Sequence, residues 1–254
     1  MSILKSLTTA YALVFPVAVA VADPADLKST EVDLQLVLAA DRSGSMSGRL
    51  LLAQRRGFAA AFRSRELRNS ILSGPLGRVA VVYFEWSDPL DQAVIVPWTI
   101  LADAEDIERF ANDLDRAAAP ERGDETSISG ALRFAHGLLA SNGYLSHRIV
   151  VDLSSNGRNS GGGPPLADAL DMLRDMDATV NGLVLPGGYH DDPGPYAMLT
   201  SGYDGPLEDY FIRHVIGGPG AFAIEVDPDA GFTAAILRKL VLEVAWVVPE
   251  EDGG

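Results

Sequence analysis

The strongest constraint on the fold is a series of short apolar runs that alternates with amphipathic segments. The runs Leu36–Ala40 and Val79–Phe84 are continuous, which is typical of strands buried on both faces of a sheet. Segments with helical periodicity separate most of these runs. The alternation predicts an α/β domain in which helices cover both faces of a mostly parallel sheet.

Six strands and six helices are expected. Because a short turn at 87–91 joins the second and third strands, and Pro97 lies in the third, that strand is expected to be antiparallel and at an edge. The expected strands are Glu31–Ala40, Gly77–Trp86, Gln92–Trp98, His147–Leu153, Ala178–Leu185 and Ala221–Val226, and the expected helices are Leu50–Phe62, Asp103–Arg116, Ser127–Leu139, Leu166–Met176, Leu207–Val215 and Phe232–Val247.

The amino-terminal segment has the pattern of a signal peptide. Lys5 precedes the apolar run Leu7–Val21, and Ala20-Val21-Ala22 fits the small-x-small rule for cleavage. The run is shorter than the ~20 residues that span a bilayer, so export is favoured over a membrane anchor. We expect a signal peptide at 1–22, a linker at 23–30, one domain at 31–248 and a flexible tail at 249–254, in a periplasmic or secreted bacterial protein.

Composition excludes several classes of function. The chain has no Cys, so neither disulfides nor a thiolate zinc site can form. Its formal net charge of -15 disfavours nucleic acid and anionic lipid as partners. A cation or a basic surface of another protein is a better candidate for a partner. An alternative of at least equal weight is that the acidic residues serve only to keep the protein soluble.

Polar side chains follow the buried strands at the points where ligands bind in open parallel sheets. Asp41, Ser43 and Ser45 follow the first strand, Asn156 follows the strand His147–Leu153, and Thr126 precedes a helix between them. Hydroxyl and carboxylate oxygens are hard ligands that suit Mg²⁺, with Mn²⁺ or Ca²⁺ as alternatives. Since Ser and Asp are also common capping residues, the D-x-S-x-S pattern alone is weak.

The stretch Val37–Ser45 resembles the metal-ion-dependent adhesion site of von Willebrand factor A domains. More closely, nearly the whole mature chain resembles the bacterial exported family DUF1194. The matching stretches are Gln54–Phe58, Gly77–Ala80, Glu85-Trp86, Val96–Thr99, Thr126–Ile128, Asn181–Leu183 and Val215–Phe222.

This resemblance implies a Rossmann-like, three-layer αβα fold with sheet order 3-2-1-4-5-6 and one antiparallel edge strand. It implies no settled activity. The chain departs from the family pattern at one position, because Asn156-Gly157 replaces an Asp-Gly in which the Asp usually holds a metal-bound water. Asn removes a negative charge, so metal affinity is expected to fall.

Other chemistry has little support in the sequence. The four His residues lack metal-pair spacing, and Asp191, Asp192 and Asp204 lack the spacing of a Ca²⁺ loop. No nucleophile elbow, dinucleotide fingerprint or Walker lysine is present, so no enzymatic activity is expected. For Asp152, within a buried strand, a structural hydrogen bond is expected.

Two functional hypotheses follow. In the first, Ser43, Ser45 and Thr126 bind the cation directly, Asp41 and Asn156 act through water or as supports, and a partner protein supplies a carboxylate. The loop 186–206 would contribute to the choice of partner. In the second, the chain is a metal-independent structural or assembly protein of the envelope with a degenerate site, which the Asn156 substitution favours.

Overall fold

The computed structural model describes residues 29–118, 121–185, 206–227 and 231–245. The expected signal peptide, most of the expected linker, the loop 186–205 with Asp191, Asp192 and Asp204, and the expected tail lie outside the described residues. The main sheet contains β2 (Leu34–Asp41), β3 (Val79–Trp86), β4 (Gln92–Leu101), β6 (Ile149–Ser155), β7 (Thr179–Val184) and β8 (Ala223–Glu225).

The order of the main sheet is β4-β3-β2-β6-β7-β8, and all neighbours are parallel except β3 and β4. Counted along the chain, these six strands have the expected order 3-2-1-4-5-6, and Pro97 lies on the antiparallel edge strand. A separate parallel pair, β1 (Thr30–Glu31) with β5 (Tyr144–Leu145), was not expected. The fold class is therefore confirmed, with one added two-stranded sheet.

The central strands are buried on both faces, as their continuous apolar runs predict. Every residue of β2 and β3 is buried. Leu36 and Leu38 pack in one hydrophobic cluster, whereas Val37 and Ala39 pack in another on the opposite face. This alternation gives the sheet two apolar surfaces, and each requires a layer of helices.

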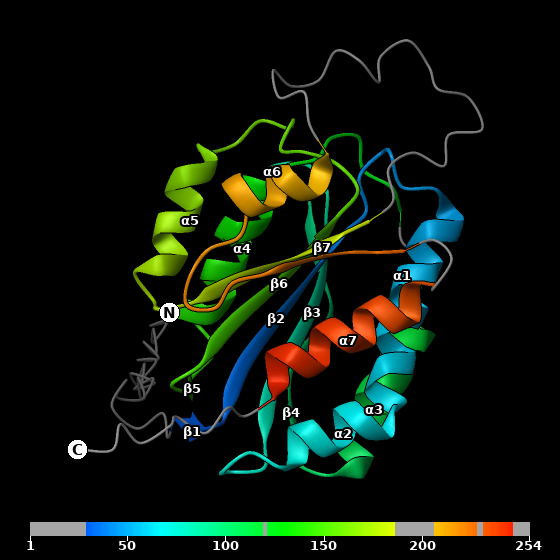
Figure 1. Ribbon diagram of the computed structural model, residues 1–254, viewed down its shortest axis with the longest axis vertical. Coiled ribbons are helices and arrows are strands. Elements are labelled where there is room, and N and C mark those ends of the chain that lie inside the picture. Colours follow the sequence, from blue (N-terminus) through cyan, green and yellow to red (C-terminus); the bar gives the residue numbers. More distant parts are fainter. Residues whose placement is uncertain (1–28, 119–120, 186–205, 228–230, 246–254) are drawn as a thin grey trace, which may run out of the picture.

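The helices form these two layers (Figure 1). One layer covers the face that Leu36 and Leu38 present, and the other covers the opposite face. The first layer contains α1 (Gly48–Arg63), α2 (Arg65–Leu72), α3 (Ala104–Arg116) and α7 (Phe232–Val244), and the second contains α4 (Ile128–Ala140), α5 (Leu166–Arg174) and α6 (Leu207–His214). Among the described helices, none is both long enough and apolar enough to cross a bilayer.

Capping side chains fix several helix starts. Ser47, Asp103 and Ser127 each accept a hydrogen bond from a backbone N–H in the first turn of α1, α3 and α4. Helix α2 was not expected from the sequence. It arises because Ser64 ends α1 in an extended conformation and its hydroxyl then accepts from the backbone N–H of Leu67.

Candidate metal centre

The candidate site is built around Asp41, the last residue of β2, whose side chain is fully buried. Asp41 Oδ1 accepts a hydrogen bond from the backbone N–H of Ser43 at 2.6 Å. Its Oδ2 accepts from the Ser155 hydroxyl at 2.5 Å and from the backbone N–H of Asn156 at 3.3 Å. A single carboxylate therefore ties the loop after β2 to the loop after β6.

The two loops meet through side chains as well. Ser43 Oγ lies 3.1 Å from Ser45 Oγ, and Ser45 Oγ donates a hydrogen bond of 2.7 Å to Asn156 Oδ1. The contact is possible because β2 and β6 are adjacent parallel strands, so their carboxyl ends lie at the same edge of the sheet. The structure thus brings together four of the five residues singled out in the sequence.

Thr126, the fifth residue, comes from a third loop that packs on the other two. Its backbone carbonyl accepts hydrogen bonds from the backbone N–H groups of Ser160 and Gly161 at 2.9 and 3.0 Å. A Cβ placed on Gly157 would lie 3.4 Å from Thr126 Oγ1. The Thr126 hydroxyl therefore lies beside the turn that contains Asn156, and the Thr126 side chain is buried.

Gly44 permits the close approach of the first and third loops. A Cβ at this position would lie 2.9 Å from the backbone oxygen of Asp124, which is too close for ordinary packing. The backbone N–H of Gly123 also donates to the backbone oxygen of Arg42 at 3.1 Å. A side chain at position 44 would push these loops apart, so the glycine is required here for space.

Arg42 does not fill the site. Its guanidinium donates to the backbone oxygen of Glu121 at 2.5 Å and forms an ion pair with Asp91. Both partners lie in loops beside the site, so the basic side chain holds the rim together and leaves the hydroxyl cluster without a cation of its own. A guanidinium among the hydroxyl groups would have excluded a metal ion.

The charge of the site favours a cation. Burial raises the pKa of Asp41 above its usual range, which the hydrogen bonds from Ser155 and Ser43 partly offset. Asp41 forms no ion pair within the described part of the chain. A buried carboxylate beside three hydroxyl groups suits a hard divalent ion, which would supply the missing positive charge.

The donor set differs from that of carboxylate-rich metal sites. Within the described ranges, no group of three or more His, Cys, Asp or Glu side chains is placed to hold a metal ion. Hydroxyl, amide and water oxygens would have to supply most of the coordination. Such a set fits Mg²⁺ or Mn²⁺ better than a softer metal.

Besides Ser155, two buried residues that support the site, Gln54 and Ser154, were not among the site residues predicted from the sequence. Gln54 of α1 donates from Nε2 to the backbone oxygen of Asp41 at 3.1 Å, and its Oε1 accepts from the Ser154 hydroxyl at 2.9 Å. Gln54 and Ser154 therefore link the loop that begins at Asp41 to the end of β6. The stretch Gln54–Phe58 matches the family pattern, and this was the available signal.

Residues considered for other roles lie elsewhere or have structural partners. In place of the structural hydrogen bond expected for Asp152, the structure shows a structural ion pair, with Lys239 of α7 at 2.8 Å. The hydroxyl of Ser45 donates to an amide instead of a histidine. Ser45 is therefore not paired with a general base, as a nucleophilic serine would be.

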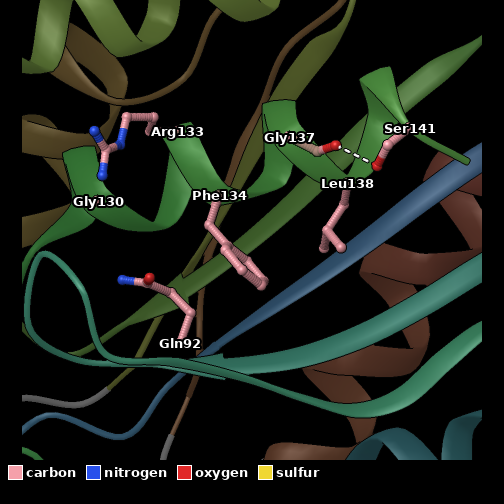
Figure 2. A pocket seen from close by; sticks show the side chains of 7 residues that line it. All are labelled: Gln92, Gly130, Arg133, Phe134, Gly137, Leu138 and Ser141. Carbon is pink, nitrogen blue, oxygen red and sulfur yellow. Dashed lines mark hydrogen bonds between the residues drawn. The ribbon is translucent and has the colours of Figure 1, made fainter.

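A groove of about 360 Å³ lies between α4 and β4 (Figure 2). Phe134 and Leu138 of α4 line it from one side, and Gln92 of β4 lines it from the other. Gly137 opens it further, because a Cβ there would meet no atom within 4 Å. The groove begins near Gly130, in the first turn of α4, and therefore adjoins the Thr126 loop.

Solved structures with this fold include those of three proteins. The pilus adhesin SpaC of Lactobacillus rhamnosus GG, in its open conformation, matches with a TM-score of 0.56 at 13% identity, over 84% of this chain and 30% of the adhesin. Proximal thread matrix protein 1 from the mussel byssus, with a zinc-occupied MIDAS motif, has a TM-score of 0.53 at 14% identity, over 85% and 48%. A von Willebrand factor type A protein from Catenulispora acidiphila has a TM-score of 0.52 at 14% identity, over 84% and 43%.

In each case the chain spans less than half of the longer protein, and at these identities the likeness concerns the fold alone. A search of curated protein sequences gives no match. The family model described as a protein of unknown function, DUF1194, matches residues 31–248, which is most of the sequence. The chain therefore belongs to the DUF1194 family and has the fold of a von Willebrand factor A domain.

Proposed function

We propose that this protein is an exported binding module that uses a divalent cation to engage an acidic group of a partner protein. Ser43, Ser45 and Thr126 are the proposed direct ligands. Asp41 and Asn156 act through bound water or as supports, and the partner's carboxylate completes the coordination. Mg²⁺ is the expected ion, with Mn²⁺ and Ca²⁺ as alternatives.

The observation that carries the proposal is the junction of three loops around a buried, unpaired carboxylate. Asp41 has the negative charge, Ser43 and Ser45 lie 3.1 Å apart, and Arg42 is bound outside the cluster. One carboxylate neutralises only half the charge of a divalent ion. An acidic ligand from outside would therefore bind strongly at the open position.

The similar solved structures and the groove beside α4 also support a binding module. The solved structures of similar fold include a pilus adhesin and a thread matrix protein of the mussel byssus. We propose periplasmic or secreted localisation. We also propose that the protein has no enzymatic activity, since the Ser45 hydroxyl donates to the Asn156 amide oxygen in the described part of the chain and not to a histidine. The groove lined by Phe134 and Leu138 begins at Gly130, close to Thr126 in the sequence. A partner bound at the cation would therefore lie next to this groove.

Calorimetric titration of the purified protein with Mg²⁺ and Mn²⁺ tests the proposal. We expect binding by the unaltered protein and a loss of affinity of about 10- to 100-fold in Thr126→Ala and Asp41→Ala. Ser70→Ala is the matched control, because this hydroxyl is exposed on α2 and should not affect the metal. Thermal unfolding of each variant identifies losses that come from misfolding.

A metal-independent envelope protein is the second candidate. The observation in its favour is Asn156, which lacks the charge of the Asp in the family pattern and already bonds directly to Ser45. In this case the hydroxyl cluster serves only to join the loops. Absence of heat in the unaltered protein, with both metals, would support this candidate and reject the first.

A further inference from the structure

Strand β4 forms one edge of the main sheet, and within the described residues it pairs only with β3. A free edge presents backbone N–H and C=O groups to which another strand can bond, and charged residues or Pro commonly protect such edges. β4 contains no charged residue, and Pro97 lies beyond its first five residues. The stretch 92–96 is therefore open to a further strand.

A hydrogen bond on the β2 side shows which backbone groups of β4 point to this edge. The backbone oxygen of Trp86 accepts from the backbone N–H of Arg42 at 2.8 Å and so does not bond to β4. Trp86 is the β-sheet partner of Gln92, and hydrogen-bonded and non-hydrogen-bonded pairs alternate in an antiparallel ladder. Gln92 and Val94 therefore direct their N–H and C=O groups away from β3, toward the open edge.

The side chains of Gln92 and Val94 lie on the face of the sheet that α4 covers. Their β-sheet partners, Trp86 and Phe84, belong to the hydrophobic cluster on that face, and opposed side chains of neighbouring strands share a face. Val94 is nevertheless 42% exposed. Helix α4 therefore leaves this part of β4 uncovered, and the groove lies between the two elements (Figure 2).

The wall of the groove formed by α4 is apolar and has room for another chain. Phe134 and Leu138 line it together with Gly137, where a Cβ would meet no atom within 4 Å. Arg133 is the only charged residue among those that line the groove, and its side chain is exposed. Figure 2 shows Arg133 and Gln92 toward the same end of the groove.

We propose that β4 and α4 form a binding site for an extended segment of a partner protein, which pairs with the open edge of β4 and places alternate side chains in the groove. In such sites the main-chain hydrogen bonds give affinity, and pockets for alternate side chains give specificity. The groove selects an apolar side chain beside Phe134 and Leu138, and an acidic side chain two residues away beside Arg133. The site does not require the cation and goes beyond the function proposed above.

A second copy of the chain fits this groove less well than an acidic segment. Pairing of two β4 strands would bring a second Arg133 to the same face of the joined sheet. None of the residues that line the groove is a carboxylate that could balance this charge. An acidic side chain from a different protein supplies the opposite charge.

Fluorescence anisotropy with a labelled peptide tests the proposal, in a chelator so that no divalent cation contributes. The probe is an eight-residue threonine peptide with one aspartate and one leucine two positions apart. We expect saturable binding to the unaltered protein below about 1 mM. Two further versions carry N-methyl groups on alternate backbone amides, at the odd or at the even positions. Only one of these should bind, because a paired strand directs every second N–H to β4.

Two variants test the groove without disturbing the core. Gly137→Leu fills the open space and should abolish binding, whereas the higher helix propensity of Leu should keep α4 stable. Its matched control is Ala140→Leu, which is exposed on the same helix outside the groove. Arg133→Glu should weaken binding about fivefold, and a peptide with lysine in place of aspartate should restore it. Arg65→Glu makes the same charge change on α2 and should have no effect.

Three results would each reject the site: no saturable binding by the unaltered protein, equal loss with both methylated peptides, or full binding by Gly137→Leu. Binding that appears only when Mn²⁺ replaces the chelator would assign the peptide to the cation and also reject a separate site. Sedimentation identifies the remaining alternative. A dimer of the unaltered protein that Gly137→Leu dissociates would make a second copy the occupant and overturn the assignment to a partner segment.

Discussion

Asp152 and Asp41 are two buried acidic residues of the same sheet, and their side chains have different kinds of partner. Asp152 lies in the interior of β6, where Lys239 of α7 pairs with it at 2.8 Å and also pairs with Glu243. Asp41 lies at the end of β2, only three residues beyond Leu38, which is the β-sheet partner of Asp152. It receives hydrogen bonds from Ser43, Ser155 and Asn156 but no basic side chain.

The difference indicates that Asp152 has a structural role, whereas Asp41 is available for a ligand. The group around Asp152 contains its own cation, and it joins α7 to the sheet through the hydrogen bond from Asn181 to Glu243 at 3.0 Å. Glu85 is similarly paired with Arg55 at 2.8 Å. Asp41 has the same burial without such a partner, so its charge has to be removed by a bound proton or balanced by a cation from outside the chain.

The largest effect is expected from Lys239→Met. The change leaves two buried carboxyl groups without their cation and should lower the free energy of unfolding by about 3–5 kcal/mol. Urea unfolding measures the loss. Leu242→Met, on the exposed face of the same helix, should change little. A loss from Lys239→Met no greater than that of the control would break the comparison.

Asp41→Asn should behave in the opposite manner. Without metal, its free energy of unfolding should stay within roughly 1 kcal/mol of the original, because removal of an unpaired buried charge offsets the altered hydrogen bonds. Mg²⁺ at 100 times its Kd should stabilise the unaltered protein by about 2.7 kcal/mol and this variant hardly at all. Urea unfolding with Mg²⁺ and with a chelator checks both expectations. Equal stabilisation of the two proteins by Mg²⁺ would contradict the assignment of Asp41.

The group around Asp152 should also make stability depend on pH. Burial, with a contribution from Asp152, raises the pKa of Glu243 from 4.5 to about 8. Between these values the folded state binds more protons than the unfolded state, so this residue's contribution to stability falls as the pH rises, by at most about 1.4 kcal/mol per pH unit. Urea unfolding at several pH values should show a smaller decline in Glu243→Gln. If stability falls with pH as steeply in Glu243→Gln as in the unaltered protein, Glu243 is not the source of this pH dependence.

Arg42→Met should have the smallest effect. Arg42 is the basic residue next to Asp41 in the sequence, but its partners are Glu121 and the half-exposed Asp91. The loss should be about 1 kcal/mol, and stabilisation by Mg²⁺ should remain within about 0.5 kcal/mol. If Mg²⁺ binding instead strengthens greatly, Arg42 acts as a counter-charge of Asp41, and the contrast with Lys239 disappears.

Most of the sheet could be predicted from the sequence because its signals are local. The continuous run Leu36–Ala40 indicates a buried strand, and Pro97 indicates an edge. Helix α2 was missed because a single extended residue, Ser64, separates it from α1. The β1–β5 pair was missed because two-residue strands have no detectable periodicity.

The site was predictable where its residues follow strands and not where they depend on packing. Asp41, Ser43, Ser45, Thr126 and Asn156 each follow a strand or precede a helix, and strand order brings them to one edge. Gln54 is a polar residue on the buried face of α1, beside Leu51 and Phe58, and nothing in its spacing indicates which groups it contacts. The pairing of Lys239 with Asp152 depends on where α7 packs, which no local pattern reveals.

Anomalous diffraction from crystals that contain Mn²⁺ tests the central claim most directly. We predict one strong peak among the hydroxyl oxygens of Ser43, Ser45 and Thr126, about 2.1 Å from each. A peak on the acidic turn of Asp88 and Asp91 instead, or no peak in crystals whose solution contains millimolar Mn²⁺, would contradict it.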